Sequence, residues 1–170
     1  MQVIRELMAN AANNLRRPLI NSHKSNLHYN PLIKQFTNLL MKDGKKQKSM
    51  SILLRTLDTI EKTSNQEPFG VLQDALSKAR PLVALKKRKL KSRIELQPRS
   101  LAEKQGNRIA IKWLIKESAN RKDPFLHIRL AKEIVAAASN EGEVIKKKNT
   151  LHEEVAKTRS ALFRVMRLIK

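Results

Sequence analysis

The middle of the chain reads Lys86-Lys87-Arg88-Lys89-Leu90-Lys91-Ser92-Arg93. This run carries six positive charges and no negative charge, and it lies between apolar Leu82–Leu85 and the alternating Ile94-Glu95-Leu96. We therefore expect a basic β-hairpin at about residues 82–98, with the charges at its tip. Like charges packed this closely repel one another and cost stability unless a polyanion neutralises them, so the run favours a nucleic-acid partner.

The whole chain is strongly basic. Its 170 residues include 36 Lys and Arg against 15 Asp and Glu, which leaves a net charge of +21. No segment approaches the roughly 18 consecutive apolar residues of a spanning helix, so we expect no membrane partner. The chain has no Cys, which excludes disulfides, thiolate metal sites and a cysteine nucleophile.

Residues 1–30 combine basic side chains with a polar Asn, Ser and His stretch and lack a lasting periodicity. We interpret them as a nucleic-acid-binding arm. An organelle-targeting segment is the alternative, because Arg5, Arg16 and Arg17 stand against a single acid, Glu6. Residues 31–170 are expected to form one domain with a core of Leu, Ile, Val and Ala.

Helix signals are clear before the hairpin. Pro31 can open a first helix, and the turn Asp43-Gly44 ends it. The second helix then begins at Lys45, Lys46 and Lys48, and residues 63–66 interrupt it. Pro68 starts a third helix, which Arg80-Pro81 ends. The expected inner faces carry Leu32, Ile33, Phe36, Leu39, Leu40, Met50, Leu53, Leu54, Leu57, Ile60, Leu72, Ala75, Leu76 and Ala79.

Three further helices are expected after the hairpin. Ser100 with Glu103 has the spacing of a capping box, Asp123-Pro124 supplies a cap and a first-turn proline, and Lys146–Lys148 precede the last helix. The predicted fold is mostly α, a bundle of about six helices with one protruding basic β-hairpin. The inner faces here carry Ile109, Trp113, Leu114, Phe125, Ile128, Ala131, Val135, Ala138, Leu151, Val155, Leu162, Met166 and Ile169.

Residues suited to catalysis or metal binding form no recognisable site. The four His have no metal-ligand spacing, adjacent carboxylates on a helix point apart, and no Walker-type phosphate loop occurs. Trp113 lies on an apolar helix face beside Ile109 and is interpreted as core rather than as a base-stacking residue. We expect no enzyme activity, no cofactor and no metal.

The lysines at helix starts support binding of anions. Lys45 and Lys46 would oppose the helix dipole if they stood alone, whereas a phosphate bound there would contact both the side chains and the free backbone N–H groups. Lys146–Lys148 repeat this pattern. Together with the hairpin run, these clusters predict a broad surface that binds phosphates with a steep salt dependence.

Several motifs resemble one known family. They are Pro31-Leu-Ile-Lys-Gln-Phe-Thr-Asn-Leu-Leu-Met-Lys-Asp-Gly-Lys-Lys46, Arg80-Pro81-Leu82-Val83, Ala110-Ile-Lys-Trp113, Arg129-Leu-Ala-Lys-Glu133 and Ile145-Lys-Lys-Lys with His152. In this order, over roughly residues 31–160, the chain resembles small-subunit ribosomal protein seven.

The resemblance implies six helices with a protruding hairpin, bound to the 3′ major domain of small-subunit ribosomal RNA in the subunit head. It implies neighbouring head and platform proteins as partners, a hairpin near exit-site transfer RNA and the messenger RNA path, and no catalysis. The residues expected to contact RNA are Lys45, Lys46, Lys48, Arg80, Lys86, Lys87, Arg88, Lys89, Lys91, Arg93, Lys112, Lys146, Lys147 and Lys148.

The chain departs from the family pattern at two places. Lys91–Leu96 replace the paired glycines and the Ser-Thr-Tyr-Gln stretch of the usual hairpin, and Ser160–Arg164 replace an aromatic and His-rich motif. This divergence, with an excess of Lys, Asn and Ile, favours a mitochondrial origin over the alternatives of a plastid or the bacterial cytoplasm. A DNA-binding helix-turn-helix regulator is the competing functional class, because the turn Asp43-Gly44 joins two short helices.

Overall fold

The computed structural model describes residues 30–90 and 93–168. The expected arm at residues 1–30 therefore lies outside the described residues, apart from Asn30, and so do Lys91 and Ser92 in the hairpin turn. The side chains of residues 88, 90, 93–95 and 159–168 are outside the description as well.

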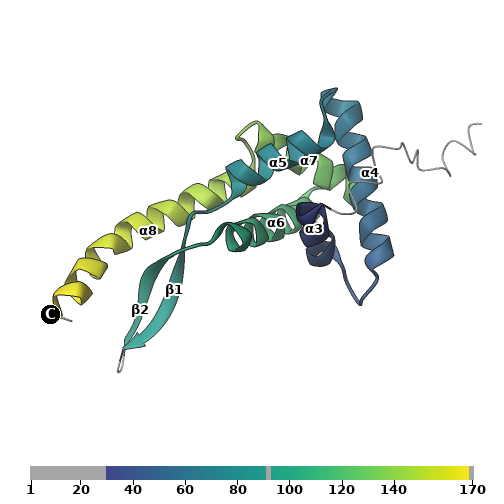
Figure 1. Ribbon diagram of the computed structural model, residues 1–170. Coiled ribbons are helices and arrows are strands. Elements are labelled where there is room, and N and C mark those ends of the chain that lie inside the picture. The colour runs from purple at the N-terminus through teal and green to yellow at the C-terminus, as the bar shows by residue number, and fades with distance from the viewer. Residues whose placement is uncertain (1–29, 91–92, 169–170) are drawn as a thin grey trace, which may run out of the picture.

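Six helices and one antiparallel hairpin make up the described part of the chain, which confirms the predicted fold class (Figure 1). In chain order they are α3 (Pro31–Leu40), α4 (Lys46–Ser64), α5 (Pro68–Ala79), β1 (Val83–Leu90), β2 (Arg93–Ser100), α6 (Glu103–Asn120), α7 (Leu126–Ala138) and α8 (Glu143–Leu168). Against the predicted 82–98, β1 begins one residue later, at Val83, and β2 runs two residues further, to Ser100. The amide of Leu101 donates to the carbonyl of Leu82 at 2.9 Å and closes the hairpin base.

The helix starts before the hairpin lie where the sequence predicts them. Pro31 occupies the first turn of α3, and the Asn30 side chain accepts a hydrogen bond from the amide of Leu32 at 2.9 Å. Asp43 and Gly44 both have positive φ, 52° and 70°, in the turn before α4. Since this region of backbone conformation suits Gly and short polar residues, the turn is encoded locally.

The helix starts after the hairpin differ from the prediction. Ser100 is not a helix cap, because it pairs with Val83 in the strand ladder, and Ala102 precedes α6 instead. Asp123-Pro124 does not open α7, which begins at Leu126, because Phe125 is still extended, with φ −105° and ψ 135°. The Asp123 carboxylate instead pairs with Lys132 of that helix at 2.6 Å.

The last helix begins earlier than expected. It starts at Glu143, directly after Gly142, whose φ of 91° suits glycine. Lys146–Lys148 therefore lie inside α8 rather than before it, and the anion-binding argument from a helix start does not apply to them.

Helix α7 lies at the centre of the core and packs against α4, α5 and α6. Its fully buried apolar residues are Leu130, Ala131, Ile134 and Ala137, of which only Ala131 was predicted. The predicted Val135 and Ala138 are partly buried against the core. Phe125 was predicted to be internal but is 59% exposed, because it precedes the helix. In α6 the prediction was closer: Leu114 is buried, whereas Ile109 and Trp113 are half-buried at the core's edge.

The hairpin protrudes from the helical body, and α8 runs past its base before extending outward (Figure 1). The hairpin root is held by a close approach of α6. A Cβ added at Gly106 would meet the Arg80 Cγ at 2.7 Å and the Pro81 carbonyl oxygen at 2.9 Å. The close packing therefore requires Gly106. This requirement explains why a glycine stands inside α6, although glycine lowers the stability of a helix.

Candidate nucleic-acid interface

The distal half of the hairpin presents the basic run. Lys86, Lys87 and Lys89 are exposed, and no ion pair joins them to an acid among the residues that the structure describes. The strand register runs from Val83 opposite Ser100 to Leu90 opposite Arg93, and it sets Glu95, the hairpin's single acid, opposite Arg88. The charges therefore project from the body on a two-stranded support.

The start of α4 presents a second group of cations. Lys45, Lys46 and Lys48 are exposed, as predicted, and no side chain caps this helix start. Lys45 approaches Asp43 at 3.8 Å, but both side chains are largely exposed, so the attraction is weak. The amide of Lys46 donates to the Gly44 carbonyl at 2.8 Å, so an anion at this helix start would meet the three lysine side chains and the next amides of the first turn.

Helix α6 carries basic residues that the sequence reasoning missed. Lys104, Arg108, Lys112 and Lys116 are all exposed and recur every four residues, so they form one row along the helix, here called the α6 row. Only Lys112 was predicted to contact RNA. The four-residue spacing was visible in the sequence and would have identified the other three.

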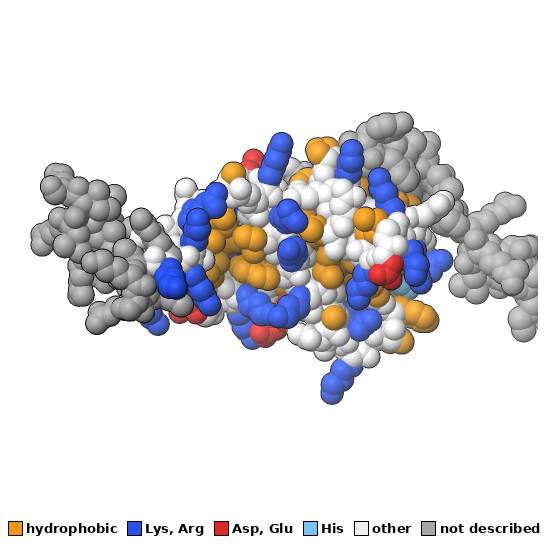
Figure 2. Space-filling model, turned by 90° about the horizontal axis from the view of Figure 1, so that it is seen from below, with side chains coloured by type: hydrophobic (Ala, Val, Ile, Leu, Met, Phe, Trp, Pro, Cys, Tyr) orange, Lys and Arg blue, Asp and Glu red, His pale blue; other side chains and the backbone are white. Residues whose placement is uncertain are grey.

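Figure 2 shows the face of the molecule that looks downward in Figure 1. Lys and Arg side chains are spread across this face and outnumber Asp and Glu, with apolar side chains between them. A surface with one dominant sign of charge over several elements has the character of a phosphate-binding surface.

Arg80, another predicted contact, has a structural partner. Its guanidinium donates to the Glu103 carboxylate at 2.6 Å, which ties the end of α5 to the start of α6 beside Gly106. Its side chain is only 27% exposed.

The three lysines of α8 also have internal partners. Lys147 pairs with the buried carboxylate of Glu117 on α6, and Lys148 donates to the carbonyl of Lys78 near the end of α5. Lys146 pairs with Glu143 at 2.7 Å on the surface of the same helix. The hydrogen bond from Lys147 lowers the pKa of the Glu117 carboxyl against the opposing effect of burial, and Asn120 assists.

Among the described residues, no cluster of three or more His, Asp or Glu is suited to bind a metal ion. Over the same part of the chain, every helix is too short or too polar to cross a bilayer.

Comparison with known proteins agrees with this geometry. Residues 8–159 match the family described as ribosomal protein S7p/S5e. The chain is 33% identical over 121 residues to "Small ribosomal subunit protein uS7" of Wigglesworthia glossinidia brevipalpis, a match that spans 71% of this chain and 78% of the relative. It is 32% identical over 123 residues to the protein of the same name from Dichelobacter nodosus, across 72% and 79% of the two chains. The chain therefore belongs to the ribosomal protein S7p/S5e family, whose members are structural proteins and not enzymes.

Proposed function

We propose that this chain organises the head of the small ribosomal subunit by clamping ribosomal RNA of the 3′ major domain through many phosphate contacts. As a member of its family it is a structural constituent of the small subunit. The observation that carries the clamp is the group of exposed hairpin lysines, Lys86, Lys87 and Lys89, without acidic partners among the described residues. Unpaired cations on a rigid projection are stabilised when a phosphate backbone neutralises them.

The proposed contact surface combines three areas: the hairpin, the start of α4 and the α6 row. Arg80 and Lys146–Lys148 remain proposed contacts, although their internal pairing makes them weaker candidates than Lys45 or Lys86. RNA helices give side chains little access to the major groove, so shape and backbone are expected to carry most of the recognition.

The hairpin projects beyond the helical body, so it can reach partners that the body does not touch. We propose that it approaches exit-site transfer RNA and the messenger RNA path, with neighbouring head and platform proteins beside it. The Lys-rich sequence around Lys91 suits a polyanion better than a protein surface of mixed charge.

The DNA-regulator alternative is not favoured. The cluster of cations on α4, at Lys45, Lys46 and Lys48, lies at its start rather than along a reading face, and the body of the helix contributes Leu53, Leu57 and Ile60 to the core.

We propose a mitochondrial ribosome as the location, on the basis of the Lys-, Asn- and Ile-rich composition and the divergent hairpin. The two relatives described above are bacterial. Immunogold labelling or organelle fractionation of the source cells tests this origin, and recovery of the chain in plastids or bacterial cytoplasm would overturn it.

Co-sedimentation in a sucrose gradient tests the clamp. The unchanged chain is expected to travel with the small subunit. A variant with Lys86, Lys87, Arg88 and Lys89 replaced by Gln is expected to remain at the top of the gradient with an unchanged circular dichroism spectrum. Loss of helical content in this variant would make the run structural, and co-sedimentation of the variant would remove the hairpin from the clamp.

A further inference from the structure

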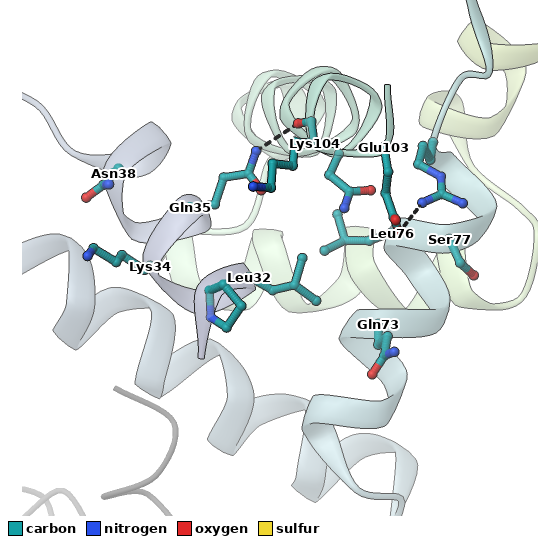
Figure 3. A pocket seen from close by; sticks show the side chains of 12 residues that line it. Leu32, Lys34, Gln35, Asn38, Gln73, Leu76, Ser77, Glu103 and Lys104 are labelled. Carbon is teal, nitrogen blue, oxygen red and sulfur yellow. Dashed lines mark hydrogen bonds and ion pairs between the residues drawn. The ribbon is translucent and has the colours of Figure 1, made fainter. Parts of the chain in front are cut away.

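A groove of about 600 Å³ lies between α3, α5 and α6 (Figure 3). Its apolar side is built by Pro31, Leu32 and Leu76, and its polar side includes the amides of Asn38 and Gln73. Two contacts brace its walls: the Gln35 amide donates to the Lys104 carbonyl at 3.0 Å, and Arg80 pairs with Glu103. Both contacts are drawn in Figure 3. These hydrogen bonds connect the three helices, so the tertiary structure itself holds the walls of the groove in place.

The charged side chains around the groove indicate the charge of the ligand that it could bind. Its lining contains Lys34, Arg80 and Lys104 against one carboxylate, that of Glu103, which already pairs with Arg80. Lys34 and Lys104 are exposed and make no ion pair within the described part of the chain. The occupant should therefore carry negative charge, and it should also present a flat apolar surface to Pro31 and Leu32, the accessible apolar side chains of the lining.

The polar side chains of the lining indicate the hydrogen-bonding groups that the ligand should carry. Gln73 is an exposed amide on the α5 side of the groove, and it offers both donors and an acceptor (Figure 3). A nucleobase alternates donors and acceptors along its Watson–Crick edge, has two apolar faces and is joined to a phosphate. The volume lies within the range of pockets that hold a ligand of this size.

The basic N-terminal residues fit the groove less well. Residues 1–29 contain Arg5, Arg16, Arg17 and Lys24 against the single acid Glu6, so their charge has the same sign as the groove rim. Like charges brought together in this way cost free energy.

We propose that the groove between α3, α5 and α6 binds one unpaired nucleotide of the ribosomal RNA, with its base against Pro31 and Leu32, its edge on Gln73, and its phosphate near Lys34 and Lys104. This inference rests on the proposed RNA clamp and adds to it a base contact, where the clamp supplies only backbone contacts. Such a contact would fix the register of the protein on the RNA.

The test uses the full chain and a transcript of the 3′ major domain of small-subunit ribosomal RNA. Gln73→Trp places a large side chain in the groove, and Gln66→Trp, an exposed amide in the turn between α4 and α5, is its matched control. Base-selective chemical probing reads protection at Watson–Crick edges, and hydroxyl-radical probing reads protection of the backbone.

With the unchanged chain and with Gln66→Trp, one unpaired base is expected to be protected. With Gln73→Trp that base regains reactivity, the backbone footprint persists, and affinity falls by about 5- to 20-fold, the scale of one stacked base. Gln73→Met, which nearly keeps the size of the side chain and removes the amide, is expected to weaken protection of the same base.

Two results separate failure of the base site from failure of the clamp. An intact backbone footprint without any base whose reactivity depends on Gln73 would overturn the nucleotide site and leave the clamp standing. Absence of a backbone footprint with the unchanged chain at low salt would overturn the clamp, and the nucleotide site with it.

Discussion

Gly106 is the residue at which the hairpin root depends on the absence of a side chain. A Cβ there would lie 2.7 Å from the Arg80 Cγ and 2.9 Å from the Pro81 carbonyl oxygen. Gly106→Ala is therefore expected to lower the free energy of unfolding by about 1–3 kcal/mol, because the backbone at Pro81 must shift. Urea denaturation followed by circular dichroism measures this change.

Gly70 provides the matched control for Gly106. It lies in α5, and the nearest atom to an added Cβ is the Glu67 Oε2 at 4.0 Å. Gly70→Ala should raise the free energy of unfolding by roughly 0.5–1 kcal/mol through helix propensity alone. Equal effects of the two substitutions would contradict the close-packing role of Gly106.

Lys45 and Lys46 allow a test in which stability and binding change in opposite directions. Both stand at the positive end of the α4 dipole without a side-chain cap. Replacing both with Gln is expected to raise stability by roughly a few tenths of a kcal/mol and to weaken RNA binding. Thermal denaturation and filter binding to the transcript measure the two effects.

Lys62, in the last turn of the same helix, is the control for that pair. Lys62→Gln removes a charge that favours the helix dipole, so stability should fall slightly while RNA affinity stays the same. If the Lys45 and Lys46 variant kept full affinity, the start of α4 would not belong to the contact surface.

At the scale of elements, the packing of α6 against α8 depends on Lys147 and Glu117. The Glu117 side chain is only 7% exposed and its pKa lies below the ordinary value of 4.5, first because of the Lys147 hydrogen bond. Lys147→Met leaves that carboxylate with Asn120 as its partner. We expect the free energy of unfolding to fall by about 1–2 kcal/mol at neutral pH, moderated because Lys147 is 39% exposed.

The pH dependence of this effect has a definite sign. A carboxyl whose pKa is lowered by folding contributes stability above its ordinary value of 4.5, and that contribution disappears as pH falls through the lowered pKa. The difference between the unchanged chain and Lys147→Met should therefore shrink in acid. Denaturation series at several pH values measure it, with the exposed Lys146→Met as a control expected to change little.

At the scale of the whole molecule, the clamp predicts a steep dependence of affinity on salt. Each phosphate contact releases counterions, so the slope of log affinity against log salt should be steeper than about −3. Titrations of the transcript at several salt concentrations measure the slope. A slope nearer zero would rule out many simultaneous phosphate contacts.

The α6 row tests how far the contact surface extends. A variant with Gln at Lys104, Arg108, Lys112 and Lys116 is expected to have a shallower slope, by roughly 0.7–0.9 for each phosphate that the variant no longer neutralises. The four positions are exposed, so the fold should persist. An unchanged slope would exclude the row from the interface.

Most of the fold was predictable from local signals. Pro31, Pro68 and the turn Asp43-Gly44 marked helix boundaries correctly, because proline and residues with positive φ restrict the chain whatever surrounds them. Ser100 and Asp123 misled the prediction: Ser100 joins the strand ladder opposite Val83, and Asp123 pairs with Lys132 inside α7 instead of capping the first turn of that helix. Capping propensity is weak enough for such partners to override it.

The candidate surface was predictable in part. The hairpin lysines and the start of α4 were identified correctly as exposed cations, since dense charge of one sign is stable only at a surface. The role of Lys147 was missed, because its partner Glu117 lies 30 residues earlier in the chain. The groove was missed for the same reason, since α3, α5 and α6 supply its walls.

The amino-acid sequence alone determined the helices before the hairpin, the hairpin itself and the preference for a polyanionic partner, because residue spacing and net charge act over a few residues or over the whole chain. Tertiary structure alone decided which lysines are paired with buried carboxylates and carbonyls, which face of α7 is buried and where a groove remains open. Those properties depend on contacts between distant segments, and packing of the helices around α7 creates these contacts.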